Sequence, residues 1–237
     1  MKKALWWLLP LAFSGSLQAA ELPSFNATFN VIAFGFNIGE AKQSMKCEAS
    51  KCEITSIASP PKWAQAFINE SAIEKVQLKQ TEQQLKWLQY KKFLTRRYKD
   101  HTEHKTYTLV RNEKTHQIDY LEGNKHWPEQ KQVYDVISLA YGIQYQIINQ
   151  RPLDNLYFQD DKSQQKLVFS VKNADDEIVL DFNEEVQTKR FEFHNGKIAV
   201  KLWLIPELNW FPGQIEIENK AEDRTITLEL NKIPKTF

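Results

Sequence analysis

Glycine is scarce in this chain, at 7 of 237 residues, where an average protein has about 7%. The glycine-rich loops that cradle dinucleotides or nucleoside triphosphates are absent, which argues against those enzyme classes. Two cysteines are too few for a disulfide scaffold or a cysteine-rich zinc module. Positive and negative charges nearly cancel, with 31 Lys and Arg against 30 Asp and Glu, so nothing favours nucleic acid as a partner.

Long hydrophobic runs are also missing, apart from one at the start of the chain. Lys2 and Lys3 precede an apolar stretch over residues 4–13, and small residues lead to Ala19 and Ala20. This order is typical of a secretory signal peptide, and the stretch is about half the roughly 20 residues that a transmembrane helix needs. We therefore expect a signal peptide over residues 1–20, a single exported domain over residues 21–237, and no transmembrane segment after cleavage.

The two cysteines fit export to an oxidising compartment. Cys47 and Cys52 enclose four residues and are flanked by two segments that look like strands. A hairpin with a four-residue loop would bring the two Cα atoms within bridging distance. A disulfide is therefore expected, and the spacing does not match the Cys-x-x-Cys of a redox dithiol.

Alternation with a period of two dominates the rest of the chain. It runs through residues 29–34, 167–171, 178–182, 191–193, 198–204, 215–217 and 226–230, with turn signals such as Asn195-Gly196 between the runs. Such alternation indicates strands with one buried face, and about nine to eleven antiparallel strands are expected. A sheet of that size does not stay flat, so the sequence predicts a mainly β fold with a strongly curved antiparallel sheet, a half-barrel or open barrel.

Two segments have helical patterns. Residues 60–67 begin with two prolines, which suit a first helical turn. A longer apolar stripe starts after Asp135, a candidate N-cap, and ends at Arg151-Pro152. One or two helices should therefore cover the concave face of the sheet.

Catalytic chemistry is poorly represented. His101, Glu103 and His104 form the one metal-like cluster, but on a strand residues 101 and 103 share a face while 104 points away, and zinc needs three or four ligands. Paired carboxylates, such as Asp160-Asp161, fall in loop-like stretches. We expect no enzyme activity, no metal and no cofactor.

A basic segment leaves two interpretations open. Its cations alternate with aromatic residues and could face anionic lipid head groups or form the solvated face of a strand pair. The residues concerned are Lys91, Lys92, Arg96, Arg97, Lys99 and Lys105, with Tyr90, Phe93, Tyr98 and Tyr107 between them.

Some strands carry apolar residues on both faces. In the strand over residues 198–205, Trp203 and Ile205 oppose Leu202 and Leu204. Either both faces of the sheet are covered by other elements, or one face lines a cavity for an apolar guest.

Three stretches together resemble an exported Gram-negative family known as domain of unknown function 3108. They are Phe29-Asn-Val31 with Gly35 and Ile38-Gly39-Glu40-Ala41, then Tyr134-Asp135-Val-Ile-Ser138-Leu-Ala-Tyr141, and finally the segment from Lys201-Leu202-Trp203-Leu204 to Pro212. The resemblance spans nearly the whole mature chain. It implies a periplasmic location and a fold similar to that of periplasmic lipoprotein carriers, whose curved sheet encloses an apolar cavity.

Two functions follow from this resemblance and the apolar strand faces. The first is a non-catalytic periplasmic protein that holds a lipid or the acyl chain of a lipoprotein at the concave face of its sheet and serves envelope maintenance. The second is an envelope adaptor that docks a protein partner through a sheet edge or an aromatic patch. The candidate ligand-binding residues are Phe34, Phe36, Trp63, Phe67, Tyr141, Trp203 and Trp210.

Overall fold

The computed structural model describes residues 19–61, 69–220 and 223–237 of the chain. Within these residues the fold is mainly β, with one antiparallel sheet of 14 strands, a second sheet of three strands, and a single α-helix. The expected signal peptide lies almost wholly outside the described residues, as does most of the helix expected over residues 60–67.

The strands of the first half are β1 (Phe25–Ala33), β2 (Phe36–Glu48), β3 (Lys51–Ser59), β4 (Glu70–Gln80), β5 (Leu85–Arg97), β6 (Thr102–Asn112), β7 (Gln117–Tyr120), β8 (Lys125–Pro128) and β9 (Gln132–Tyr134). Next come helix α1 (Leu139–Ile148), β10 (Leu156–Gln159) and β11 (Gln164–Lys166). The second half holds β12 (Val168–Leu180), β13 (Asn183–His194), β14 (Ile198–Ile205), the 3-10 turn η2 (Pro206–Leu208), β15 (Phe211–Asn219), β16 (Arg224–Leu230) and β17 (Lys235–Thr236).

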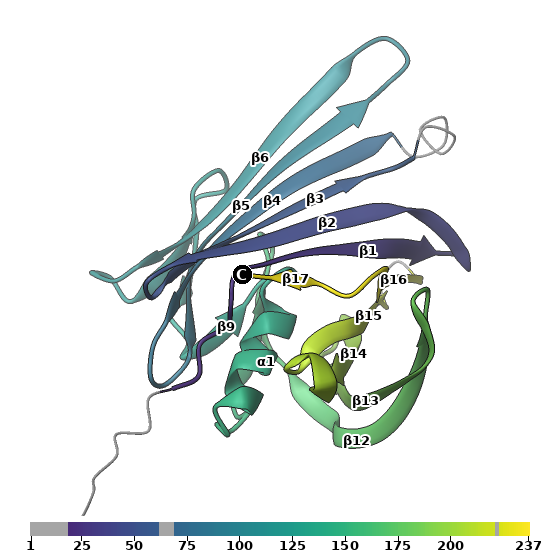
Figure 1. The fold of residues 1–237 in the computed structure, drawn as a ribbon. Helices are drawn as coiled ribbons and strands as arrows, with labels where there is room; N and C mark the ends of the chain where they lie inside the picture. Colours follow the sequence, from purple (N-terminus) through teal and green to yellow (C-terminus); the bar gives the residue numbers. More distant parts are fainter. Residues whose placement is uncertain (1–18, 62–68, 221–222) are drawn as a thin grey trace, which may run out of the picture.

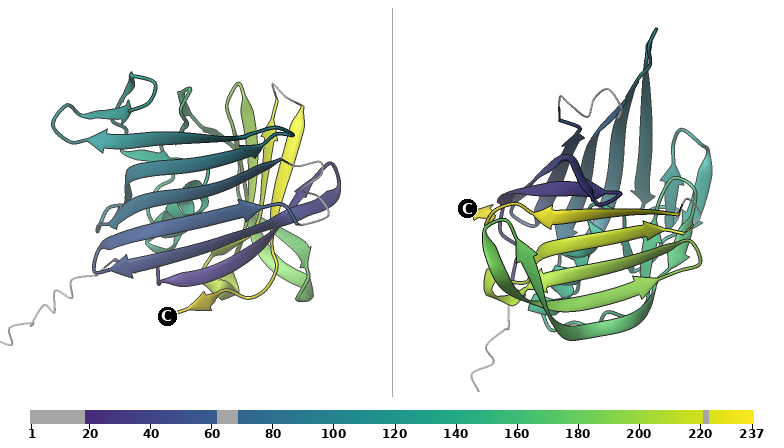
Figure 2. Two further views of the ribbon diagram at one scale, coloured as in Figure 1. Left: turned by 90° about the horizontal axis from the view of Figure 1, so that it is seen from above. Right: turned by 90° about the vertical axis from the view of Figure 1, so that its right-hand side faces the viewer.

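The large sheet is strongly curved and stays open (Figures 1 and 2). Its order is β12-β13-β14-β15-β16-β1-β2-β3-β4-β5-β6-β7-β8, with β17 added beside β1. The predicted curved antiparallel sheet is therefore confirmed. The strands outnumber the expected nine to eleven because β7, β8 and β17 have only two to four residues, too few to show a period of two.

The main core lies on the inner face of this sheet. Every second residue of the central strands points inward and is almost fully buried, as Phe29, Ile54, Val76 and Trp87 show. Helix α1 covers one end of that face (Figure 1). It approaches strand β9 closely because Gly142 has no side chain, and a Cβ there would come within 2.4 Å of the Tyr134 ring.

The β12–β13 hairpin forms a second layer on the outer face. Only residues 189–194 of β13 pair with β14, and the free end of the hairpin crosses β15 and β1. There Ile178 faces Gly213, and the Asn30 side chain donates to the Asp181 carboxylate at 2.7 Å. Both faces of β14 are thus covered, which is the simpler of the two explanations for its doubly apolar pattern.

The disulfide joins Cys47 and Cys52 across the β2–β3 hairpin, as predicted. Its two Cα atoms are 4.1 Å apart. The neighbouring Gln80 side chain donates to the Leu22 carbonyl at 3.2 Å and accepts from the Leu22 N–H at 2.7 Å. The disulfide therefore lies beside the Gln80–Leu22 contact that holds the N-terminal segment on the sheet.

Candidate ligand pocket

A pocket of about 320 Å³ opens at the end of the concave face where α1 meets strands β1, β2 and β15. Most of its lining is apolar. The walls come from the N-terminal segment, three strands, the helix, η2 and the C-terminal segment. The lining residues are Leu22, Pro23, Phe25, Met45, Gln144, Glu207, Leu208, Asn209, Phe211, Ile233, Pro234 and Thr236.

Phe25 and Phe211 form the floor, and the ring of Tyr141 backs them. The ring of Phe25 lies 5.0 Å from that of Tyr141 and 5.0 Å, edge to face, from that of Phe211. Tyr141 is fully buried behind this wall and donates its hydroxyl proton to the Gln43 side chain at 2.6 Å. Because these rings come from β1, α1 and β15, the pocket is a product of the curvature of the sheet.

Both described ends of the chain close the pocket. Phe25 of β1 pairs with Thr236 of β17, and the Phe237 N–H donates to the Ser24 carbonyl at 3.0 Å. On the other side the Gln144 amide donates to the Asn209 carbonyl at 2.8 Å and ties α1 to the turn before β15.

Helix α1 is fixed in place by a buried carboxylate just before it. Asp135 accepts hydrogen bonds from the Trp87 indole at 2.6 Å, from the N–H groups of Ile137 and Ser138, and from the Ser138 hydroxyl. Burial raises the pKa of the Asp135 carboxyl to about 6. The Asp-x-x-Ser-x-x-Tyr motif thus caps the helix through Asp135 and Ser138 and docks it on the sheet through Tyr141.

A second depression of about 270 Å³ lies on the concave face between β4–β6 and the small sheet. At its floor Tyr90 donates to Glu74 at 2.5 Å, and the Lys92 amine lies 3.5 Å from the same carboxylate. Burial first, and the Glu74 charge second, raise the pKa of the Tyr90 hydroxyl. Arg96 is paired with Glu70 at 2.6 Å. These cations are already matched by carboxylates, and a tyrosine whose pKa is raised stays protonated at neutral pH, so it offers no base there.

A larger and more open depression of about 710 Å³ is polar and lies near the β6–β7 turn. Arg111 pairs there with Glu129, and Lys86 with Glu113 at 2.7 Å. Its lining offers little apolar surface, so it does not suit an acyl chain.

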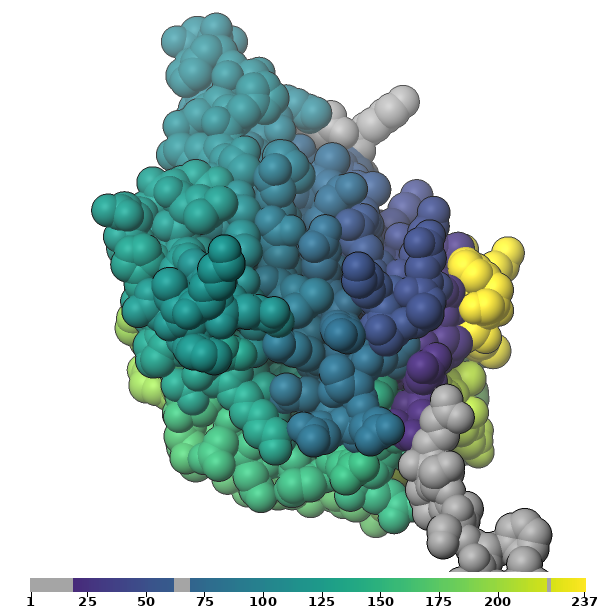
Figure 3. Space-filling model, turned by 90° about the vertical axis from the view of Figure 1, so that its left-hand side faces the viewer, coloured from purple at the N-terminus to yellow at the C-terminus, as the bar shows by residue number. Residues whose placement is uncertain are grey.

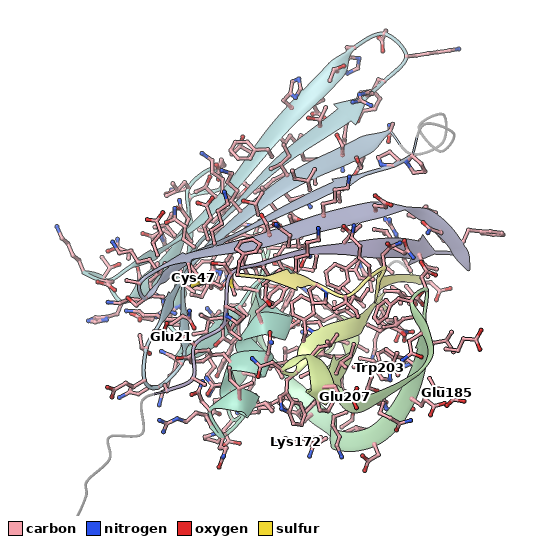
Figure 4. All side chains as sticks on the ribbon, in the orientation of Figure 1. Glu21, Cys47, Lys172, Glu185, Trp203 and Glu207 are labelled. Atoms are coloured by element: carbon pink, nitrogen blue, oxygen red, sulfur yellow. A yellow bond between two sulfur atoms is a disulfide. The ribbon has the colours of Figure 1, made fainter. Side chains whose placement is uncertain are left out.

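The seven candidate ligand-binding residues do not meet in one place. Tyr141 supports the pocket from behind, and Trp210 is half-buried at the turn leading into β15. Trp203 lies on the opposite face under the β12–β13 hairpin, where its indole donates to Asp176 at 2.9 Å (Figure 4). Phe34 and Phe36 are 76% and 70% exposed at the β1–β2 turn. Trp63 and Phe67 lie outside the described residues.

The residues that do line the pocket were not singled out from the sequence. Phe25 and Met45 belong to alternating strands, and Phe25 shares the face of Phe29. This shared face was the sequence signal that could have placed Phe25 on the concave side of the sheet. Leu22 and Ile233 come from the ends of the described chain, and nothing in a local pattern indicates that these two ends meet.

Within residues 19–61, 69–220 and 223–237, no three His, Cys, Asp or Glu side chains gather closely enough to hold a metal ion. None of the helices in the same part of the chain is long and apolar enough to cross a membrane. No protein-family model and no curated protein matches the sequence. The family resemblance therefore stays a prediction.

Proposed function

We propose that this is a non-catalytic periplasmic protein that binds an apolar ligand, a lipid or the acyl chain of a modified partner, at the concave face of its curved sheet. Its role would be in maintenance of the cell envelope. The pocket between α1, β1, β2 and β15 would receive the chain. Burial alone would drive binding, since each methylene group that leaves water contributes about 0.8 kcal/mol.

The observation that carries this proposal is the pocket of about 320 Å³ with its apolar lining. Ligand sites in proteins have volumes of about 300–1,000 Å³ and are mostly apolar with a few polar groups. The 270 Å³ depression is smaller and holds paired charges, and the 710 Å³ depression is polar. The mostly apolar pocket is therefore the best match among the three.

A series of straight-chain alcohols of increasing length tests the proposal. Each added methylene should tighten binding about fourfold, from about 0.8 kcal/mol per buried group, until the chain is longer than the pocket. Isothermal titration calorimetry on the mature protein would measure this series. A plateau at a defined length supports a pocket of fixed depth, whereas no binding at any length would rule the proposal out.

A matched pair of substitutions locates the binding site. Leu208 is half-buried in the pocket wall, and Leu208→Trp should fill the space and weaken binding of the longest alcohol by about tenfold or more. Leu121 is 61% exposed in the turn between β7 and β8, so Leu121→Trp adds the same bulk away from the pocket. Equal affinities for the two variants would place the ligand elsewhere.

Docking of a protein partner is the second candidate function, and the β1–β2 turn favours it. Phe34 has φ +54° and Gly35 φ +77°, which fits a type I′ hairpin turn, where Asn-Gly is preferred. An exposed Phe at that position has no role in the core. A photo-crosslinker at position 36 should then give one adduct of defined mass in cells, and Phe34→Asn should abolish it.

A further inference from the structure

Lysines face lysines across the outer side of the sheet. The register sets Lys51 opposite Lys79, and Lys79 opposite Lys86 on the next strand. In a neighbouring row Lys75 lies opposite Lys91. Like charges directly across an antiparallel pair destabilise it. A local rule broken without gain to the fold is expected mainly at functional surfaces.

The imbalance extends over the outer face of β2–β5, which is the face of the sheet turned toward the viewer in Figure 2, left. The outward cations there are Lys42, Lys46, Lys51, Lys75, Lys79, Lys86, Lys91 and Arg97, and the outward anions are Glu40, Glu48 and Glu53. The whole chain has a net charge of only +1. This basic face therefore concentrates positive charge that the rest of the molecule balances.

Three of these eight cations have an ion-pair partner in the described residues, and the closest pair is Lys86 with Glu113 at 2.7 Å. Lys42 lies 3.9 Å from Glu40, and Lys75 lies 3.6 Å from Glu53. All four side chains are between 43% and 69% exposed. Exposed pairs of this kind contribute little. In the part of the chain that the structure describes, neither Lys51 nor Lys79 has an ion-pair partner within 4.0 Å.

An apolar row crosses the basic face beside Lys42, Lys75 and Lys91. Ile57, Ile73 and Phe93 are direct neighbours across β3, β4 and β5. Their side chains are 45%, 42% and 38% exposed, although the outward positions of a half-covered antiparallel sheet are normally polar. The Lys91 amine lies over the Phe93 ring, 4.9 Å from its centre, so charge and apolar surface are joined in one patch.

We propose that the basic face docks the protein on a lipid bilayer that contains anionic phospholipids. The lysines around the row would meet lipid phosphates, and Ile57, Ile73 and Phe93 would enter the interface between head groups and chains. Basic residues near an anionic bilayer and apolar side chains in its interface are the two known sources of affinity for such peripheral binding.

The shape of the patch favours a bilayer over a soluble polyanion. The face is the convex side of the curved sheet, and the register places the apolar row next to the Lys75–Lys91 pair, with Lys42 opposite Ile57. A polyanion needs charge alone and gains nothing from the row. The patch is also separate from the apolar pocket, which lies on the concave side, so either proposal can fail without the other.

Vesicle flotation tests the docking proposal. The probe is vesicles of phosphatidylcholine with about one third phosphatidylglycerol, compared with phosphatidylcholine alone, at about 50 mM salt. The mature protein should bind the anionic vesicles and lose most of that binding at about 500 mM salt. Lys75→Glu with Lys91→Glu should lower the partition coefficient by about tenfold or more.

Two further variants separate the proposal from a general charge effect. Lys166→Glu with Lys172→Glu makes the same change of net charge on β11 and β12, where Lys172 lies far from the basic face (Figure 4), and should leave binding unchanged. Ile73→Ser with Phe93→Ser should weaken vesicle binding and spare binding to soluble polyphosphate. The proposal is overturned if both charge pairs act equally, or if the apolar pair has no effect on vesicles.

Discussion

Asp135 shows how one buried carboxylate couples the helix to pH. Its pKa is raised from 3.8 to about 6 by burial, so the folded state holds the proton more tightly than the unfolded chain does. Between about pH 4 and pH 6 the folded state then binds more protons, and its stability falls as pH rises through that window. A shift of this size corresponds to roughly 3 kcal/mol at most.

Asp135→Asn tests this coupling because it removes the titration. We expect the stability difference between wild type and variant to be larger near pH 4 than near pH 7, where the wild-type carboxylate is charged. Urea unfolding at several pH values measures that difference, and the subtraction cancels the other carboxyl groups. A difference that stays constant with pH would contradict the assignment of a raised pKa.

At this scale the sequence was informative where the chemistry is local. Asp135 was expected as a helix cap, and its carboxylate accepts the Ile137 and Ser138 N–H groups. Trp203 was expected to line a cavity, yet it bonds Asp176 on the other face. Alternation shows that two faces exist, and only the tertiary path of the β12–β13 hairpin decides what covers each one.

The second prediction concerns the lysines that face one another across strands β3, β4 and β5. Lys79 lies between Lys51 and Lys86 in the register, so Lys79→Glu converts two repulsive cross-strand pairs into attractive ones. We expect the free energy of unfolding to rise by about 0.5–2 kcal/mol. The gain should shrink at high salt because exposed charges are screened. Urea unfolding at low and high salt measures both effects.

Gln77→Glu is the matched control on the same strand. Gln77 also points outward, but its neighbour across the strand is Glu53, so the new carboxylate meets a like charge and should not stabilise. If both variants stabilise equally, net charge and not the row of lysines is responsible. If Lys79→Glu raises the free energy of unfolding and also reduces vesicle binding, the same lysines lower the stability of the fold and promote docking.

Strand existence and the curved sheet could be predicted from the period of two, whereas the functional surfaces could not. The basic segment over residues 91–105 is split by the pleat, which sends Lys92 and Arg96 to the concave face and Lys91 to the outer one. The row of Lys51, Lys79 and Lys86 exists only in a given register. Register depends on turn lengths and bulges, such as the one between Gln77 and Leu78, which a pattern does not reveal.

At the scale of the whole molecule, the two candidate surfaces lie on opposite sides of the large sheet. The apolar pocket is on the inner side, closed by the helix and the described chain ends, and the basic face is on the outer side of neighbouring strands. The β5–β6 hairpin projects beyond both (Figure 3). A protein docked by the outer face would keep the pocket free, so ligand exchange and docking can occur together.

The C-terminal segment is the thinnest wall of the pocket, and its removal gives the last prediction. Leu230 is the last fully buried residue, while Ile233 is 58% exposed although it lines the pocket. Ending the chain at Asn231 should cost only about 1–2 kcal/mol of stability but weaken alcohol binding by about tenfold. Phe237→Ser is the control and should change little, because it removes a side chain that is 69% exposed and keeps the N–H that bonds the Ser24 carbonyl. Calorimetry measures the affinities and urea unfolding the stabilities. Unchanged binding after truncation at Asn231 would show that the C-terminal segment is not a wall of the site.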